Sequence, residues 1–354
     1  MRVVPALMLL IALSVPAAAT EPAEVLRRAV DSVIRPGFAQ LAGRAVGLEK
    51  DISNLCATPS DTGLKLVRQQ FGKVVDAYGQ VAFLRFGPLV EASRAERLLF
   101  WPDRKGIALR QVQAILGNED AAATRLTDLQ QKSVAVQGLG ALEYVLFGDG
   151  SETLAGGSAD FRCRYARSIG AALVVTTAEL SAAWSAADGI AAHLAEPQPG
   201  YADYRSDREA LEELVGSMAH GVELIRDTQL LPFIGRQDER AKPRSALFWR
   251  SDLTLPLIRA QFAGIESLLV SSSIGHMAGA DDLWVDNSAR FELANAQRAV
   301  DIVTLPVEQA LADPAQRRAL DYLVILTGSL QTLLGENLSA ALGLSVGFSS
   351  LDGD

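Results

Sequence analysis

The chain has 354 residues, of which 49% are hydrophobic and 21% are charged, and its formal net charge is −9. This length and hydrophobic content allow a large core and two domains. The acidic balance argues against a nucleic-acid partner, because binding to phosphates needs a basic surface.

The first 19 residues have the pattern of a cleavable secretory signal. Arg2 supplies a positive start, residues 6–15 form a short apolar run, and Ala17-Ala18-Ala19 resembles a cleavage site. A membrane anchor is the alternative, but the apolar run is too short to span a bilayer. Cleavage removes Arg2 and takes the net charge from −9 to −10. We therefore expect an exported, periplasmic protein with no transmembrane span in the mature chain.

The sequence contains two cysteines, Cys56 and Cys163. In an oxidising compartment an even number of cysteines favours one disulfide, and two buried free thiols are the alternative. The disulfide would close a loop of over a hundred residues.

Apolar residues recur at helical spacing along the first part of the chain. We expect a helix from Pro22 that is kinked rather than ended at Pro36-Gly37, and a second helix capped by Ser60. A break at Gly87-Pro88 precedes a stretch that mixes charges of both signs with large aromatic side chains. Such a mixture can mark a polar cleft, and a loop held by surface ion pairs is the alternative. Its candidate binding residues are Arg94, Glu96, Arg97, Trp101, Asp103 and Arg104.

The stretch 137–148 combines three glycines with one carboxylate, Glu143, in an otherwise apolar segment. A charged side chain buried there needs a partner. We expect this stretch to end a helix capped by Thr127. The further helices predicted from periodicity and caps are 161–194, 206–230 with the capping box Ser206 and Glu209, 254–272, 283–303, and 314–334 with Asp313 as cap.

No segment shows sustained alternation of polar and apolar residues, so the sequence predicts an all-α fold. We expect two helical-bundle halves around a shared cleft, with an N-terminal bundle over 20–195, a linker over 196–205 and a C-terminal bundle over 206–354. Leu99-Phe100-Trp101 is echoed by Leu247-Phe248-Trp249, and an arginine follows each at similar spacing. The echo indicates a duplication, and chance is the alternative.

The familiar catalytic patterns are missing from the sequence. The three histidines are scattered, and neither a Gly-x-Ser-x-Gly elbow nor a His-Glu-x-x-His motif occurs. His220 and Glu223 do have the i, i+3 spacing of metal ligands on one helix face. An ordinary pair on a helix surface is the alternative.

Several motifs taken together resemble the imelysin family. They are the turn at 56–60, Arg85-Phe86-Gly87-Pro88, Glu96-Arg97 leading into Phe100-Trp101-Pro102-Asp103, the stretch 137–148, and the closing segments 343–348 and 351–354. The resemblance implies an all-helical fold of two duplicated halves, a periplasmic or envelope location, and links to iron-regulated uptake.

The family motif Gly-x-His-x-x-Glu falls on Gly138 to Glu143, but Gly140 stands at the histidine position. Glycine supplies neither a metal ligand nor a general base, so Glu143 would hold a metal alone. As a structural residue, Glu143 would pair with Arg94, Arg97 or Arg104. As a functional residue, the same acid and arginines would line a ligand-binding cleft. We interpret Glu143 as a structural pair that also lines a cleft.

The preferred hypothesis is a non-enzymatic binding or accessory component of an iron-related uptake system, with iron-uptake components or haem proteins of the envelope as partners. The alternative is a metal-dependent peptidase that uses Glu143 with ligands from elsewhere, such as His220 and Glu223. Its cofactor would be an iron or zinc ion.

Overall fold

The computed structural model describes residues 21–103, 105–156, 160–235 and 239–345. Within these ranges the regular structure is helical and includes no strand, which confirms the all-α prediction. The expected signal segment, the end of the closing motif and Arg104 lie outside the described residues.

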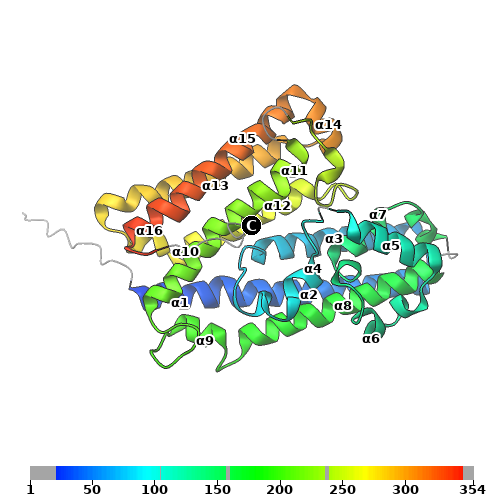
Figure 1. The fold of residues 1–354 in the computed structure, drawn as a ribbon, viewed down its shortest axis with the longest axis horizontal. Coiled ribbons are helices and arrows are strands. Elements are labelled where there is room, and N and C mark those ends of the chain that lie inside the picture. The colour runs from blue at the N-terminus through cyan, green and yellow to red at the C-terminus, as the bar shows by residue number, and fades with distance from the viewer. Residues whose placement is uncertain (1–20, 104, 157–159, 236–238, 346–354) are drawn as a thin grey trace, which may run out of the picture.

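The first part of the chain forms three long helices and several short ones (Figure 1). They are α1 (Pro22–Ala29), α2 (Arg35–Ala57), α3 (Asp61–Val81), α4 (Arg94–Leu98), α5 (Ile107–Asn118), α6 (Leu126–Leu129), α7 (Leu139–Phe147), α8 (Asp160–Ser185) and α9 (Ile190–Ala195). Short 3-10 turns lie between them at Gly87–Leu89, Glu91–Ser93, Ala121–Thr124, Val134–Val136 and Ser151–Ala155.

The second part contains four long helices. Its helices are α10 (Asp207–Leu224), α11 (Leu231–Ile234), α12 (Thr254–Ser272), α13 (Leu283–Ile302), α14 (Val307–Ala312), α15 (Pro314–Gln331) and α16 (Leu338–Ala341). Three π-helical turns continue longer rods, at Val30–Ile34, Ile225–Leu230 and Thr332–Asn337, and 3-10 turns lie at Pro243–Ser245, Ile274–Met277 and Ala280–Asp282.

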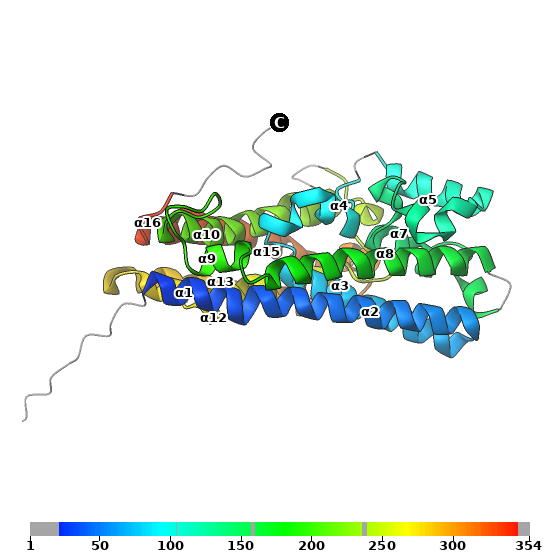
Figure 2. The ribbon, with the colours of Figure 1, turned by 90° about the horizontal axis from the view of Figure 1, so that it is seen from below.

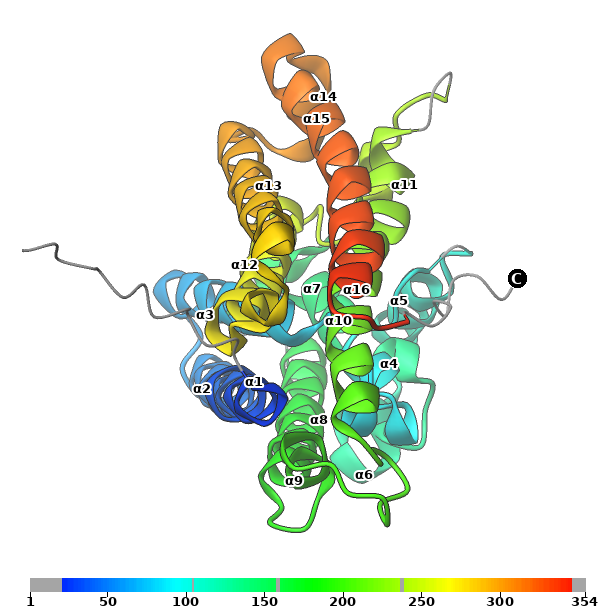
Figure 3. The ribbon, with the colours of Figure 1, turned by 90° about the vertical axis from the view of Figure 1, so that its left-hand side faces the viewer.

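The long helices pack in two groups that share one core. Helix α2 packs between α3 and α8, while α13 packs between α12 and α15. Figure 3 shows α13 and α15 rising away from the α2 and α8 side of the molecule. The groups meet where α3 packs on α12 and where α1 reaches α12 and α10. Buried hydrophobic residues of both groups form one continuous core.

Glycine allows the close contact between α3 and α12. A Cβ on Gly264 would lie 2.2 Å from the backbone oxygen of Gln80, and one on Gly79 would lie 2.7 Å from the Cβ of Ala260. Both distances are far below van der Waals contact, so only glycine permits these backbones to approach so closely. The pairing of α3 with α12 therefore depends on two residues that look unremarkable in the sequence.

Several local predictions are confirmed. The side chains of Ser60, Ser206 and Asp313 accept hydrogen bonds from the first turns of α3, α10 and α15. The helix also continues through Pro36-Gly37, but the kink expected there is absent. A π-helical turn precedes the pair, and α1 and α2 form one nearly straight rod (Figure 2).

Two predicted helices are broken in the structure. The helix expected over 161–194 ends at Ser185 and restarts as α9, with Gly189 in an extended conformation between the two. The helix expected from Thr127 is split into α6 and α7, because Gly138 is also extended and begins a new helix. Residues 196–205 contain no helix. The division of the chain there, and the duplication, remain predictions.

Candidate functional site

A pocket of about 630 Å³ lies between the two parts of the chain. It is lined by residues drawn from four segments, 99–112, 140–149, 227–232 and 244–250. The segment that joins α11 to α12 reaches the neighbourhood of α7, as Figure 1 shows. Residues from distant parts of the sequence therefore form the pocket walls. Its size is in the range of small-molecule sites in proteins.

Both Leu-Phe-Trp stretches line this pocket. Leu99, Phe100 and Trp101 come from the first part of the chain, and the second stretch, Leu247-Phe248-Trp249, comes from the second part. The Trp101 indole donates a hydrogen bond of 2.8 Å to the backbone oxygen of Thr228. Thr228 lies in the π-helical turn after α10, so this bond joins the two parts of the chain across the pocket.

Glu143 projects from α7 toward the turn formed by residues 248–253. Its side chain is buried and lines the pocket. Its Oε1 atom accepts hydrogen bonds from the backbone N–H of Arg250 at 3.1 Å, the backbone N–H of Ser251 at 3.1 Å and the Ser251 hydroxyl at 2.9 Å. Three donors on one oxygen provide the partner that a buried carboxylate requires.

The 248–253 turn owes its shape to two residues with left-handed backbone conformations. Phe248 has φ 59° and Asp252 has φ 57°, which side-chain-bearing residues rarely adopt. The backbone N–H of Leu253 donates to the Phe248 oxygen at 3.1 Å, and the Phe248 ring packs edge-on against Phe71. This conformation directs two consecutive N–H groups toward the same carboxylate oxygen, a local geometry that suits an anion.

Burial raises the pKa of Glu143 above its usual range. The Ser251 hydroxyl, the positive charge of Arg250 and the two backbone N–H groups offset this effect only in part. Glu143 is therefore a pocket carboxyl that takes up a proton more readily than an exposed glutamate does.

Two arginines lie against the aromatic wall of the pocket. The Arg250 guanidinium is 4.4 Å from the ring centre of Trp249 and 5.2 Å from that of Tyr144. The Arg244 guanidinium is 5.5 Å from the ring centre of Trp249. Among the described residues neither arginine forms an ion pair, so both charges remain available to a ligand.

Asp103 and Trp101 both line the pocket, and Asp103 also has a structural role. Its two carboxylate oxygens accept hydrogen bonds from the backbone N–H groups of Ile107 at 2.7 Å and Ala108 at 2.9 Å. Asp103 thus caps the first turn of α5. Gly140 also lines the pocket, with 4.0 Å between the position of an added Cβ and its nearest neighbour, Leu99.

The predicted pairing of Glu143 with Arg94 or Arg97 is wrong. Both arginines donate to the same oxygen of Glu179 on α8, at 3.1 Å and 2.6 Å. They sit on α4, which packs against α8. Glu96 lies 3.9 Å from Arg85. None of these charged residues lines the Glu143 pocket, so they form a separate ion-pair group.

His220 and Glu223 both lie on α10, and neither lines the pocket. Glu223 is buried, while His220 is partly exposed. The structure does not bring this pair together with Glu143. Within the described ranges, no three His, Cys, Asp or Glu side chains are grouped closely enough to hold a metal ion.

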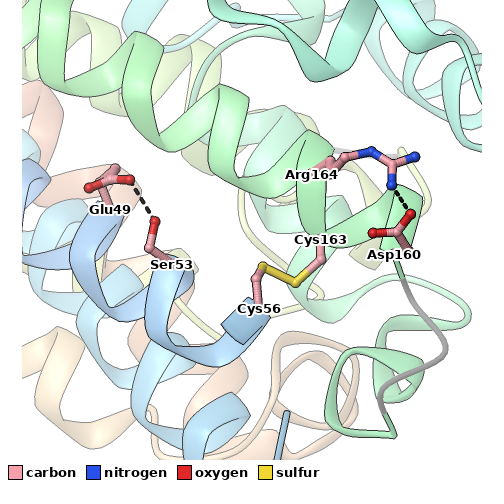
Figure 4. The surroundings of a disulfide bond; sticks show 6 residues. All are labelled: Glu49, Ser53, Cys56, Asp160, Cys163 and Arg164. Atoms are coloured by element: carbon pink, nitrogen blue, oxygen red, sulfur yellow. Dashed lines mark hydrogen bonds and ion pairs between the residues drawn. A yellow bond between two sulfur atoms is a disulfide. The ribbon is translucent and has the colours of Figure 1, made fainter. Parts of the chain in front are cut away.

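The disulfide between Cys56 and Cys163 is present, which confirms that prediction (Figure 4). It ties the last turn of α2 to the first turn of α8. It belongs to the packing of these two helices and not to the Glu143 pocket.

Sequence reasoning missed the residues that contact Glu143 and the cations beside it. Ser251, Arg250 and Arg244 all come from the segment after α11. The echo at Leu247-Phe248-Trp249 pointed to this segment, but nothing in it signalled a partner for a carboxylate. Glu179, the partner of Arg94 and Arg97, lies within the long segment 161–194, for which the sequence predicted a helix and no ion pair.

These features define an all-helical protein with a pocket that contains a buried carboxyl and two arginines that form no ion pair among the described residues. The imelysin family model matches residues 34–334, and the chain belongs to the imelysin family. Within the described residues no helix has the length and apolar character needed to cross a membrane.

Two solved structures share the fold. An imelysin-like protein from Psychrobacter arcticum has 19% sequence identity and a TM-score of 0.76, covering 94% of this chain and 100% of its own. A "putative iron-regulated protein A precursor" from Parabacteroides distasonis has 15% identity and a TM-score of 0.74, covering 93% of this chain and 97% of its own. Comparison with curated proteins gives no match.

Proposed function

We propose that this protein is a non-enzymatic, periplasmic binding or accessory component of an iron-related uptake system, and that it holds a ligand in the Glu143 pocket. The observation that carries the proposal is the commitment of Glu143 to the pocket wall, where its Oε1 accepts three hydrogen bonds from the 248–253 turn. Hydrogen bonds of this kind fix the position of the carboxyl and the shape of the pocket wall around it.

The location and the link to iron have separate support. The secretory pattern of residues 1–19 supports export to the periplasm. The resemblance of the sequence to imelysins and the iron-regulated protein named among its structural relatives support a role in iron uptake. Iron-uptake components or haem proteins of the envelope are the partners that this role implies, and a pull-down from envelope extracts tests them.

A metal-dependent peptidase is the second candidate, because a buried pocket carboxyl with a raised pKa is also typical of proton-transfer groups. Metal content of the purified mature protein and cleavage of an unfolded polypeptide discriminate the two. Bound metal, together with cleavage that is lost in Glu143→Gln, would establish the peptidase.

The binding role is tested in cells with a variant that fills the pocket. Gly140→Trp places a large side chain where an added Cβ has open space, and Gly117→Trp does the same at an open position on α5 outside the pocket. Under iron limitation we expect deletion of the gene to lower iron uptake, Gly117→Trp to restore it and Gly140→Trp to fail. Normal uptake in the deletion strain, with expression unchanged by iron, contradicts the proposal.

A further inference from the structure

We propose that the Glu143 pocket takes a small organic anion with a flat apolar body, such as an aromatic carboxylate, and that Arg244 and Arg250 hold its negative group. This inference rests on the proposed binding function and adds the chemical class of the ligand. It follows from the charges that remain unpaired in the pocket and from the side chains beside them.

Three of the four carboxylates that line the pocket, those of Asp103, Asp227 and Glu143, already have partners. Asp103 accepts two backbone N–H bonds at the start of α5, and Asp227 pairs with Arg226 at 3.0 Å. Glu143 is held by the 248–253 turn. The remaining acid, Asp149, is exposed, and its backbone oxygen accepts a hydrogen bond from Arg162 at 2.6 Å. Asp103, Asp227 and Glu143 are therefore already engaged within the protein.

Arg244 and Arg250, by contrast, form no ion pair with any residue that the structure describes. Arg250 is the closer of the two to the centre of the site, because its backbone N–H contacts Glu143 and its guanidinium lies between Trp249 and Tyr144. Arg244 reaches the same Trp249 ring. Contact with aromatic rings restricts each planar guanidinium while leaving its N–H groups available, which suits recognition of a carboxylate.

The surroundings of these arginines are apolar and flat. Phe100 and Trp101 line the pocket from the first part of the chain, and Trp249 lines it from the second. All three are partly exposed. Aromatic rings of a ligand stack well on such side chains, and a pocket of about 630 Å³ has room for a ligand of two or more fused rings.

The acidity of the whole protein strengthens the argument. The chain carries a net charge of −9, so a general electrostatic attraction would favour cations at most of its surface. Arg244 and Arg250 place two positive charges in one pocket of a chain whose net charge is negative. Their placement is explained if the pocket selects an anion that the remaining surface repels.

The test is calorimetric titration of the purified mature protein with three probes that share one naphthalene ring system and differ in charge. They are naphthalene-2-carboxylate, the neutral naphthalene-2-methanol and the cationic naphthalen-2-ylmethylammonium. We expect the carboxylate to bind about tenfold to a hundredfold more tightly than the neutral probe, since a charged hydrogen-bonded pair has that effect on affinity. The cation should bind most weakly.

The arginines are tested with matched variants. Arg250→Gln and Arg244→Gln should each reduce the preference for the carboxylate, and Arg250→Lys should restore only part of it, because lysine lacks the planar fork. Arg250→Gln keeps the backbone N–H that Glu143 accepts. The control is Arg259→Gln, which removes an exposed arginine paired with Asp301 outside the pocket and should leave all three affinities unchanged.

The outcomes separate this inference from the proposed function. If the three probes bind equally well, the inference that the ligand is an anion is wrong. It is also wrong if the Arg244→Gln, Arg250→Gln double variant still prefers the carboxylate. In both cases the proposal that the pocket binds a ligand still stands. Absence of probe binding overturns the class as well, and the function still stands if Gly140→Trp abolishes iron uptake. An arginine-dependent preference supports the inference even if Gly140→Trp leaves uptake normal, and then only the link to iron fails.

Discussion

The Ser251 hydroxyl lies 2.9 Å from Oε1 of Glu143, although the two residues are 108 positions apart in the chain. This contact, with the two backbone N–H bonds beside it, joins α7 to the segment that precedes α12. The two parts of the protein are therefore connected through a single carboxylate oxygen as well as through their apolar core.

Removal of that acceptor should destabilise the protein. Glu143→Ala leaves two backbone N–H groups without a partner and takes one of its two acceptors from the Ser251 hydroxyl, which keeps the Phe248 oxygen. We expect a loss of about 2–4 kcal/mol in the free energy of unfolding. Glu143→Gln keeps an oxygen at the same place and should lose about 1 kcal/mol. Urea denaturation measures both, with Glu308→Gln as control, because Glu308 is an exposed residue of α14. Equal losses in Ala and Gln variants would contradict the role of the oxygen.

The raised pKa of Glu143 gives the folding free energy a definite dependence on pH. The folded protein binds the proton more tightly than the unfolded chain, whose glutamate has a pKa near 4.5. The contribution of Glu143 is therefore fully present below pH 4.5 and is lost as the pH rises through the folded pKa. The stability of the wild type minus that of Glu143→Gln should fall over this range, and a difference that is constant with pH would refute the assignment.

Glu179 should show the opposite dependence. Burial alone would raise the pKa of Glu179, but the hydrogen bonds from Arg94 and Arg97 outweigh it and lower the pKa below 4.5. Its contribution is present above the unfolded pKa and is lost as the pH falls through the folded value. The stability of the wild type minus that of Glu179→Gln should therefore fall on acidification, as measured by denaturation at a series of pH values.

Two glycines of one motif should respond differently to the same substitution. A Cβ on Gly138 would lie 2.5 Å from the backbone oxygen of Leu98, so Gly138→Ala should cost about 1–3 kcal/mol. A Cβ on Gly140 has no neighbour nearer than 4.0 Å, so Gly140→Ala should be neutral or stabilising by up to about 1 kcal/mol. Thermal unfolding of the pair checks this, and similar effects at both positions would contradict it.

Loss of the disulfide should affect stability but not ligand binding. Cys56 and Cys163 are 107 positions apart, and a crosslink over that length stabilises by about 4–5 kcal/mol in the chain-entropy account. The Cys56→Ser, Cys163→Ser double variant should lose most of this in urea denaturation. Affinity for naphthalene-2-carboxylate should not change, because the bond lies outside the pocket. Reductant should destabilise the wild type and leave the variant unaffected.

The features that could be predicted from the sequence are local ones. Ser60, Ser206 and Asp313 cap helices because a short polar side chain reaches N–H groups two or three residues ahead. Helical periodicity is also a local property that a few turns of sequence reveal. The all-α fold and most of the long helices could therefore be predicted from it. The disulfide followed from the count of two cysteines.

The partners of the site could not be predicted in this way. Two of the donors to Glu143 are backbone N–H groups, which nearly every residue possesses, and they are aligned by the left-handed conformation of Phe248. Nothing in the identity of a phenylalanine indicates that its backbone will adopt this conformation. Arg94 and Arg97 do pair with an acid, but with Glu179 instead of Glu143, because α4 packs on α8. Long-range packing decided both cases.

The engagement of Glu143 with the 248–253 turn has a consequence for reading related sequences. A glutamate that holds two segments together contributes to folding, whatever chemistry the neighbouring positions support. Its presence therefore identifies the architecture and is a poor marker of metal binding. Position 140 is the better marker, because a side chain there meets open space in the pocket and can change without disturbing the fold.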